Sequence, residues 1–330
     1  MTSNAVAVLG CGSWGATMAA MLHERGLSIR LWGHRADEIA DLRTKGHPPG
    51  VPELRLPQIT LTTDLAAAVS GVAFAVAVVP SQALARVAAQ LAALPEHLPA
   101  LVIASKGIDL ETLRPLSAVV EAALPRTTVA VLSGPCIARE VALGVPTSVV
   151  VACRNEDLGA EIQQLISAPA FRVYRQHDVL GVEYGGALKN VIAIAAGVGD
   201  GLGFGANSKS ALLTRGLDEM RRLAMALGAE EATISGLSGL GDLCVTCFSP
   251  YSRNRRFGEA LGSGKSAAEA TALIGETVEG VPTAAAAVRI AAQHGIEVPI
   301  AHAVTQIVIG EWGPREAVTR LMGRELRAEF

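Results

Sequence analysis

One lysine stands in an otherwise apolar segment that could form a helix. The segment GVEYGGALKNVIAIAAGVG runs from Gly181 to Gly199, and in a helix the residues three and four positions from Lys189 would be glycine, isoleucine and alanine. None of these can pair with its ammonium group. Such a lysine could face a bound cofactor, although it could also reach the surface along its aliphatic stem or pair with Glu183.

A second polar group stands at the start of another predicted helix. In YSRNRRFGEAL, residues 251–261, this group is Ser252, Arg253 and Asn254. Such donors at a helix start are a common arrangement for binding phosphate. The structural alternatives are that Ser252 and Asn254 cap the helix and that Arg253 belongs to a solvated basic face.

An aspartate and two cysteines follow one another in a third segment. GLSGLGDL, residues 236–243, is a glycine-rich turn that presents Asp242 among apolar residues, and the CVTC that follows contains Cys244 and Cys247. A structural zinc site would need further ligands at motif spacing, and the sequence has no second pair of this kind. We therefore expect the two cysteines to be small core residues and predict no metal site.

The N-terminal residues carry a nucleotide-binding fingerprint. The apolar run Ala5–Leu9 leads into GCGSWG, which places Gly10, Gly12 and Gly15 at the G-x-G-x-x-G positions ahead of a helix-compatible segment. These glycines allow a tight turn, the approach of a pyrophosphate and close helix–strand packing. Glycine-rich turns also serve as structural bends, but the strand–turn–helix context predicts dinucleotide binding at the helix N-terminus.

The residues after the second predicted strand bear on the choice of cofactor. Where an NAD-specific enzyme usually places a carboxylate for the ribose 2′-hydroxyl, the chain has His34 and Arg35. A basic pair can bind a 2′-phosphate, so we predict that NADP is preferred over NAD. Asp37 or Glu38 could be the ribose partner instead, and the pair could also be a solvated turn.

Two further loops follow buried strands. LVIASKGID places Lys106 at the carboxyl end of one strand, and VAVLSGPCIARE places Ser133, Gly134 and Pro135 at the end of another. Ligands of open α/β sheets bind at this edge. Either loop could be an ordinary connection, but together they favour a ligand site.

Elements that could position these residues alternate along the first half of the chain. The predicted strands are Ala5–Leu9, Ser28–Trp32, Ala73–Val79, Leu101–Ala104, Val129–Leu132 and Thr147–Ala152. Their alternation with helix-like segments predicts a parallel sheet covered on both faces. From Val179 onwards, Ala/Leu-rich segments predict helices alone. We therefore predict an α/β Rossmann-like NAD(P)-binding domain over residues 1–180 and an all-α substrate-binding and catalytic domain over residues 181–330.

Composition limits the classes of partner and compartment. The chain has 330 residues, half of them hydrophobic, and a formal net charge of -3, so nothing favours binding to nucleic acid or to an anionic membrane. Apolar runs such as Val72–Val79 are too short to span a bilayer. The N-terminus does not resemble a signal peptide, which leads us to expect a chain that starts at Met1. Five scattered cysteines fit a reducing compartment, and we predict a cytoplasmic protein.

At these motifs the chain resembles the bacterial-type NAD(P)-dependent glycerol-3-phosphate dehydrogenases. The resemblance extends from GCGSWG through SKG, SGPCIARE, the long segment around Lys189, GLSGLGDL and SRNRRFG to VEGV, so it covers nearly the whole chain. It implies reversible reduction of dihydroxyacetone phosphate to sn-glycerol 3-phosphate, a phospholipid precursor. It also implies a homodimer.

Carried over residue by residue, the resemblance implies that Lys189 is the general acid/base and that Asp242 lies beside it. The developing alkoxide needs a proton and nearby positive charge, and partial burial would lower the pKa of a lysine towards a useful value. The implied substrate-binding residues are Lys106, Gly134, Cys136, Lys189, Asp242, Ser252, Arg253 and Asn254. The implied cofactor-binding residues are Gly10, Gly12, Ser13, Trp14, Gly15, His34, Arg35, Lys106, Ala138, Arg253 and Glu279.

Two positions depart from the family pattern. The family usually has a hydroxyl residue at Cys136 and an aspartate at Ala206, and the second change has no physical explanation. A 3-hydroxyacid or 6-phosphogluconate type dehydrogenase would share the nucleotide fold and a helical lysine, but it should not carry GLSGLGDL together with SRN. A non-catalytic cofactor sensor would have no need of Lys189, Asp242 or Arg253.

Overall fold

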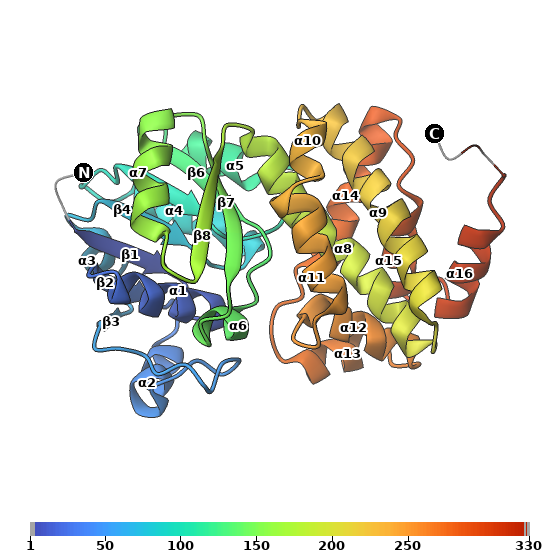
Figure 1. Ribbon diagram of the computed structural model, residues 1–330, viewed down its shortest axis with the longest axis horizontal. Helices are drawn as coiled ribbons and strands as arrows, with labels where there is room; N and C mark the ends of the chain where they lie inside the picture. Colours follow the sequence, from blue (N-terminus) through green and yellow to red (C-terminus); the bar gives the residue numbers. More distant parts are fainter. Residues whose placement is uncertain (1–3, 327, 329–330) are drawn as a thin grey trace.

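The computed structural model describes residues 4–326 and residue 328, so the expected start at Met1 lies outside the described residues. Its sheet-containing half and its helical half lie side by side (Figure 1). The strands are β1 (Ala5–Leu9), β2 (Ser28–Trp32), β3 (Thr60–Thr62), β4 (Phe74–Ala77), β5 (Ala100–Ile103), β6 (Thr128–Ser133), β7 (Thr147–Cys153) and β8 (Phe171–Gln176). They form one sheet in the order β3-β2-β1-β4-β5-β6-β7-β8.

All six predicted strands are confirmed, with small shifts of their ends, and among the described residues the sheet is parallel as predicted except at one pairing. Strand β7 pairs with β6 in the antiparallel direction, and β8 then runs parallel to β7. Two strands were not predicted. Strand β3 has only three residues, and β8 alternates buried with exposed residues at the far edge of the sheet.

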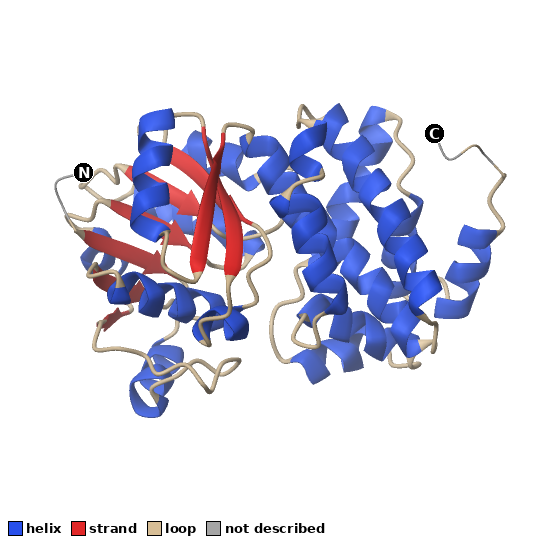
Figure 2. Ribbon diagram, viewed as in Figure 1, coloured by secondary structure: helices blue, strands red, loops and turns tan. Residues whose placement is uncertain are grey.

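Helices cover both faces of the sheet, as predicted (Figure 2). Consecutive residues of β1 alternate between two hydrophobic clusters, since Val6 and Val8 pack with one and Ala7 and Leu9 with the other. These faces are covered by α1 (Ser13–Glu24), α2 (Ala36–Lys45), α3 (Leu65–Val69), α4 (Leu84–Ala92), α5 (Leu116–Ala123), α6 (Ala138–Ala142) and α7 (Glu156–Ile166), with the 3₁₀ turn η1 (Ser81–Ala83) before α4.

The described residues after β8 form helices and no further strand. The first is α8 (Val179–Gly201), followed by α9 (Ala206–Ala226), α10 (Glu231–Ile234), the π-helix η2 (Leu237–Gly241), α11 (Asp242–Phe248), α12 (Arg253–Gly262), α13 (Ala267–Ile274), α14 (Gly280–His294), α15 (Pro299–Val308) and α16 (Pro314–Met322). The expected change from an α/β to an all-α architecture is therefore confirmed.

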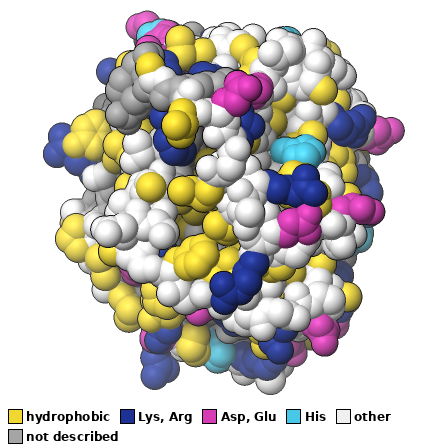
Figure 3. Space-filling view, turned by 90° about the vertical axis from the view of Figure 1, so that its right-hand side faces the viewer, with side chains coloured by type: hydrophobic (Ala, Val, Ile, Leu, Met, Phe, Trp, Pro, Cys, Tyr) yellow, Lys and Arg dark blue, Asp and Glu magenta, His cyan; other side chains and the backbone are white. Residues whose placement is uncertain are grey.

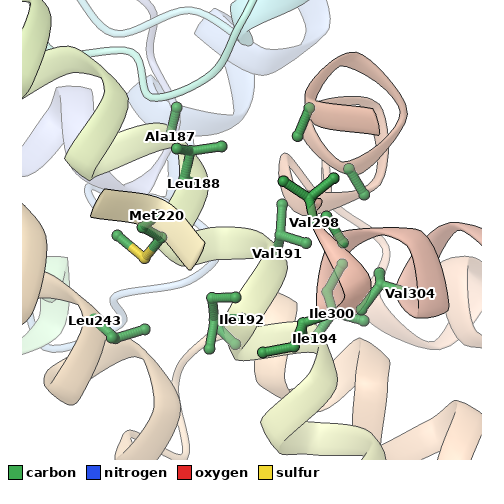
Figure 4. Packing of buried hydrophobic residues seen from close by; sticks show 14 of the residues in the cluster. Ala187, Leu188, Val191, Ile192, Ile194, Met220, Leu243, Val298, Ile300 and Val304 are labelled. Carbon is green, nitrogen blue, oxygen red and sulfur yellow. The ribbon is translucent and has the colours of Figure 1, made fainter. Parts of the chain in front are cut away.

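Helix α8 is the central element of the helical half. Its side chains pack against α9, α11, α14 and α15 in one hydrophobic cluster, part of which is shown in Figure 4. It lies especially close to α12, where a Cβ atom on Gly197 would overlap the carbonyl oxygen of Arg255. Its 23 residues are long and apolar enough to cross a membrane, which the shorter runs singled out from the sequence were not, but 89% of the most apolar window is buried inside the protein.

The end of the helical half has a mixed surface. Basic and acidic side chains are interspersed there around exposed apolar ones (Figure 3). A groove between α14, α15 and α16 is lined by apolar residues such as Val288, Ile296 and Leu321, together with Arg320 and Arg324.

Candidate active site

The lysine in the apolar segment is buried and paired. Lys189, which is only 6% exposed, lies in the middle of α8. Its Nζ atom donates hydrogen bonds to Asp242 Oδ1 at 3.0 Å and to Thr246 Oγ1 at 2.6 Å, both on α11. It therefore neither reaches the surface nor pairs with Glu183, which accepts hydrogen bonds from the backbone and side chain of Ser117.

A second lysine reaches the same carboxylate from the sheet. Lys106 follows β5, and its Nζ atom donates to Asp242 Oδ2 at 2.6 Å and to the carbonyl oxygen of Gly134 at 3.0 Å. The Sγ atom of Cys136 lies 3.4 Å from the same ammonium group. The sheet-edge loops and the helical half thus meet at one side chain, Asp242.

The shared carboxylate places the two lysines in different electrostatic environments. Burial lowers the pKa of Lys189 below its ordinary value, and Lys106 adds to this, although Asp242 opposes it. Burial also acts against the charge of Lys106, but the charge of Asp242 and the hydrogen bonds to Asp242 and Cys136 raise its pKa above the ordinary value. Asp242 is desolvated, yet the two ammonium groups hold its pKa below its usual range. The cluster therefore contains a cation with a raised pKa, an anion with a lowered pKa and one lysine whose pKa is lowered by burial.

Asp242 owes its position to an irregular turn. The π-helical residues Leu237–Gly241 lead directly into α11, which begins at Asp242. Gly239 allows this turn to pack closely, since a Cβ atom there would overlap the carbonyl oxygen of Ile234. π-helical turns occur often at functional sites.

The predicted phosphate-binding group stands at the first turn of α12. Ser252 caps this helix, and its Oγ atom accepts a hydrogen bond from the backbone N–H of Arg255. Asn254 is buried, donates to Asn190 Oδ1 at 2.9 Å and accepts from the backbone N–H of Gly280. The structural alternative of a helix cap therefore holds for Ser252, whereas Asn254 connects α12 to α8 and α14.

Arg253 is more open than its neighbours. Its side chain is 42% exposed and pairs with Glu276 across 3.3 Å. No hydrogen bond or ion pair joins it to the lysine cluster within the described part of the chain. The structure brings Lys106, Gly134, Cys136, Lys189 and Asp242 into direct contact, while Arg253 lies outside that set.

The glycine-rich turn is shaped to admit a dinucleotide. Gly10 has φ +121°, and a Cβ atom there would lie 2.7 Å from the carbonyl oxygen of Val78. A Cβ atom on Gly15 would overlap the carbonyl oxygen of Gly10, whereas one on Gly12 would meet nothing within 4 Å. Gly12 caps α1, so its open side adjoins the unpaired N–H groups of a twelve-residue helix. The residues present fit the pyrophosphate of a bound NAD(P).

Ser13 and Trp14 form the first turn of α1 beside this glycine turn. The ring of Trp14 packs against Phe171 of β8, with centroids 6.2 Å apart. Ala138 begins the short helix α6.

His34 and Arg35 are exposed just beyond β2. Arg35 pairs with Asp37 and lies 3.8 Å from Glu38, so the basic and acidic candidates for the cofactor ribose contact each other.

Glu279 precedes α14, where its carboxylate accepts hydrogen bonds from the backbone N–H and the hydroxyl of Ser81. This links the helical half to the loop after β4.

Three residues near these groups were not identified from the sequence. Thr246 contacts Lys189 and stands four positions after Asp242, so helical spacing could have revealed it. Asn190 is the neighbour of Lys189 and bonds Asn254. Ser81 follows β4 at the sheet edge, the same signal that pointed to Lys106.

The remaining sequence features have structural explanations, with one exception. Cys244 and Cys247 lie on α11 as free thiols that pack in the helical core, so the expectation of small core residues is confirmed. Ala206 begins α9 on the surface, and nothing in the structure explains it.

Comparisons with known proteins agree with this geometry. Residues 5–159 match the sequence model of the NAD-dependent glycerol-3-phosphate dehydrogenase N-terminus, and residues 178–319 match that of its C-terminus. The chain is 45% identical over 332 aligned positions to a glycerol-3-phosphate dehydrogenase (NAD(P)+) of Geobacter sulfurreducens, with 99% of each chain covered. It is 46% identical to the protein of that name from Thermobifida fusca, with 98% of each covered.

A solved structure shares the whole architecture. The crystal structure of glycerol-3-phosphate dehydrogenase from Coxiella burnetii superimposes with a TM-score of 0.94 at 37% identity, covering 98% of this chain and 99% of that one. The resemblance noted in the sequence is confirmed by these matches. The chain belongs to the NAD-dependent glycerol-3-phosphate dehydrogenase family.

Proposed function

We propose that the protein catalyses the reversible reduction of dihydroxyacetone phosphate to sn-glycerol 3-phosphate with NADH or NADPH. One observation carries this proposal: Lys106 and Lys189 share the carboxylate of Asp242 where the edge of a dinucleotide-binding sheet meets the helical half. The family membership supplies the substrate. Products of this kind serve glycerophospholipid synthesis, and we propose that role here.

The two lysines have different parts in the reaction. When bound, NADH or NADPH supplies the hydride that reduces the C2 carbonyl. Lys189 donates a proton to the developing alkoxide, since burial lowers its pKa towards neutrality. Lys106 keeps its charge and stabilises the negative oxygen, because Asp242 raises its pKa. Asp242 holds both ammonium groups in place, and in the reverse direction Lys189 takes the proton back.

The cofactor would be held along the glycine turn and the adjoining loops. Gly12 leaves open space for the pyrophosphate, Gly10 and Gly15 allow the turn and α1 to pack closely, and the first turn of α1, Ser13 and Trp14, supplies N–H groups. From the resemblance we further assign Ala138, Glu279, Lys106 and Arg253 to this site. Glu279 would act there together with Ser81, to which it is hydrogen-bonded.

We propose that NADP is preferred over NAD. His34 and Arg35 are exposed beyond β2, where a 2′-phosphate would lie. Asp37 pairs with Arg35, so the phosphate would have to replace this carboxylate on the guanidinium group. This competition makes the preference moderate rather than absolute.

The substrate phosphate is assigned to the start of α12. A protein with a net charge of -3 needs a local cation to hold a dianion, and Arg253 is a half-exposed guanidinium group in the first turn of a ten-residue helix. Asn254 lies beside it and is connected through Asn190 to the helix of Lys189. We propose that Ser252 and the loop that contains Gly134 and Cys136 also contact the substrate. The thiol of Cys136 is a weaker hydrogen-bonding group than the hydroxyl usual in the family.

The remaining assignments concern organisation. We propose domains at residues 1–180 and 181–330, supported by the change from β8 to α8 at residues 176–179. A homodimer is also proposed, and light scattering on the purified protein tests it. Fractionation of producing cells tests the proposed cytoplasmic location.

The activity is tested by following NADPH and NADH absorbance after addition of dihydroxyacetone phosphate, with a 3-hydroxyacid and its oxo partner as the alternative substrates. Rapid oxidation of the cofactor with dihydroxyacetone phosphate alone is the expected result. Turnover of the hydroxyacid pair and not of the phosphorylated ketone would assign the protein to a different reaction.

A further inference from the structure

Arg253, the residue proposed to bind the substrate phosphate, forms an ion pair with a carboxylate of the chain itself. Arg253 Nη1 donates to Glu276 Oε2 across 3.3 Å, and the two side chains are 42% and 41% exposed. Arg253 begins α12, whereas Glu276 lies in the connection between α13 and α14. Among the described residues, Glu276 is the acidic residue that forms an ion pair with Arg253.

Glu276 lies between the proposed phosphate site at Arg253 and the proposed cofactor site at the glycine turn. A Cβ atom on Gly50, in the connection between α2 and β3, would lie 3.8 Å from Glu276 Oε1 and would overlap Ser13 Oγ at the start of α1. The carboxylate therefore lies between Arg253 and a segment that contacts the glycine turn.

We propose that Glu276 competes with the substrate phosphate for Arg253 and thereby weakens the binding of phosphorylated ligands. This inference rests on the assignment of Arg253 to the phosphate under the proposed function. An exposed ion pair contributes little to stability, so a ligand can displace it. A phosphate dianion offers more charge and more acceptor oxygens than one carboxylate, so it can displace Glu276, whereas a neutral ketone does not depend on Arg253 and is not affected by the competition.

The competition predicts that removal of the carboxylate charge improves the binding of phosphate. Glu276→Gln keeps the shape of the side chain and should lower the KM for dihydroxyacetone phosphate by about two- to five-fold, the range set by an exposed ion pair, with little change in kcat. The dissociation constant of inorganic phosphate, measured by calorimetry, should fall by a similar factor. Both gains should shrink as salt screens the charges.

A matched control removes a carboxylate from another exposed pair. Glu121 pairs with Arg154 on the sheet-containing half, so Glu121→Gln changes the net charge equally and should leave both constants unchanged. In an Arg253→Ala background, Glu276→Gln should lose its effect on both constants, since the shared partner is gone.

The calorimetric measurement needs no turnover, which separates this inference from the proposed function. Failure of the wild-type protein to reduce dihydroxyacetone phosphate would count against the function alone. The inference is overturned if Glu276→Gln binds phosphate no more tightly than the wild-type protein. An equal gain in the Arg253→Ala background would also overturn it, because the effect would then be a general one of charge.

Discussion

Lys189 and Asp242 are 53 positions apart in the chain, yet Lys189 Nζ lies 3.0 Å from Asp242 Oδ1. The contact joins the central helix of the helical half to the first residue of α11, and Lys106 binds the second oxygen of the same carboxylate. One buried anion thus determines where both ammonium groups lie and how readily each gives up a proton.

Loss of the negative charge at Asp242 should disturb both the position of the two ammonium groups and the pKa of Lys189. Asp242 raises the pKa of Lys189 against the effect of burial, so Asp242→Asn should lower that pKa further. In the reduction of dihydroxyacetone phosphate, the alkaline limb of the kcat profile should move to lower pH, and kcat near neutrality should fall by about 10²-fold. The check is a kcat profile with saturating NADPH. An unchanged limb in a folded variant would mean that Asp242 does not control the proton donor.

Arg253→Ala tests the assignment of the substrate phosphate. A charge-assisted hydrogen bond contributes about 1.5–3 kcal/mol, so the substitution should lower kcat/KM for dihydroxyacetone phosphate by at least ten- to a hundred-fold. Unphosphorylated dihydroxyacetone, a poor substrate throughout, should be affected much less. Steady-state rates with both substrates decide the matter, with NADPH binding measured separately. Equal losses would assign Arg253 to the cofactor or to the fold.

Cofactor preference should depend on the turn after β2. Arg35→Asp removes a partner for the 2′-phosphate and adds an acceptor for a ribose hydroxyl. The ratio of kcat/KM for NADPH to that for NADH should therefore fall, by about ten-fold if one charged hydrogen bond is lost. Because Asp37 and Glu38 already adjoin Arg35, the variant should accept NADH readily. A ratio that stays constant would place the discriminating group elsewhere.

A buried glutamate outside the site should make stability depend on pH. Burial raises the pKa of Glu183 from 4.5 to about 7, so between these values the native state binds a proton that the unfolded state lacks. The free energy of unfolding should consequently fall as pH rises through this window. The effect of Glu183→Gln on the free energy of unfolding, measured by urea denaturation, should be more stabilising at pH 8 than at pH 5 by about 1–3 kcal/mol.

Glu316 is an exposed carboxylate that pairs with Arg320 on α16, so Glu316→Gln serves as the control and should show no such difference between the two pH values. Glu219, whose pKa burial likewise raises to about 7, should leave part of the pH dependence in place. Equal effects of Glu183→Gln at both pH values would contradict the raised pKa.

The parallel strands could be predicted from the sequence because strands buried on both faces need continuous apolar runs, as in Ala5–Leu9. The direction of β7 could not, since residue periodicity is the same in parallel and antiparallel strands. Strand β8 was missed although Phe171 and Val173 alternate with exposed residues, which is the pattern of a half-buried edge.

The local sequence predicted the parts of the site but not its contacts, although the resemblance correctly implied that Asp242 lies beside Lys189. The glycine turn is local, so its residues and their order were sufficient. The partners of Lys189 lie on another helix, and no residue within a turn of α8 could indicate them. The ion pairs of Arg35 with Asp37 and of Arg253 with Glu276 depend equally on side-chain geometry.

The most direct test is the turnover of Lys189→Ala. A positioned acid/base contributes about 10²–10⁴-fold to the chemical step, so kcat for dihydroxyacetone phosphate should fall within that range. The dissociation constant of NADPH, measured by fluorescence titration, should stay close to that of the wild-type protein. A variant that binds NADPH normally and retains near-normal kcat with an unchanged pH profile would contradict the role of Lys189 as the proton donor.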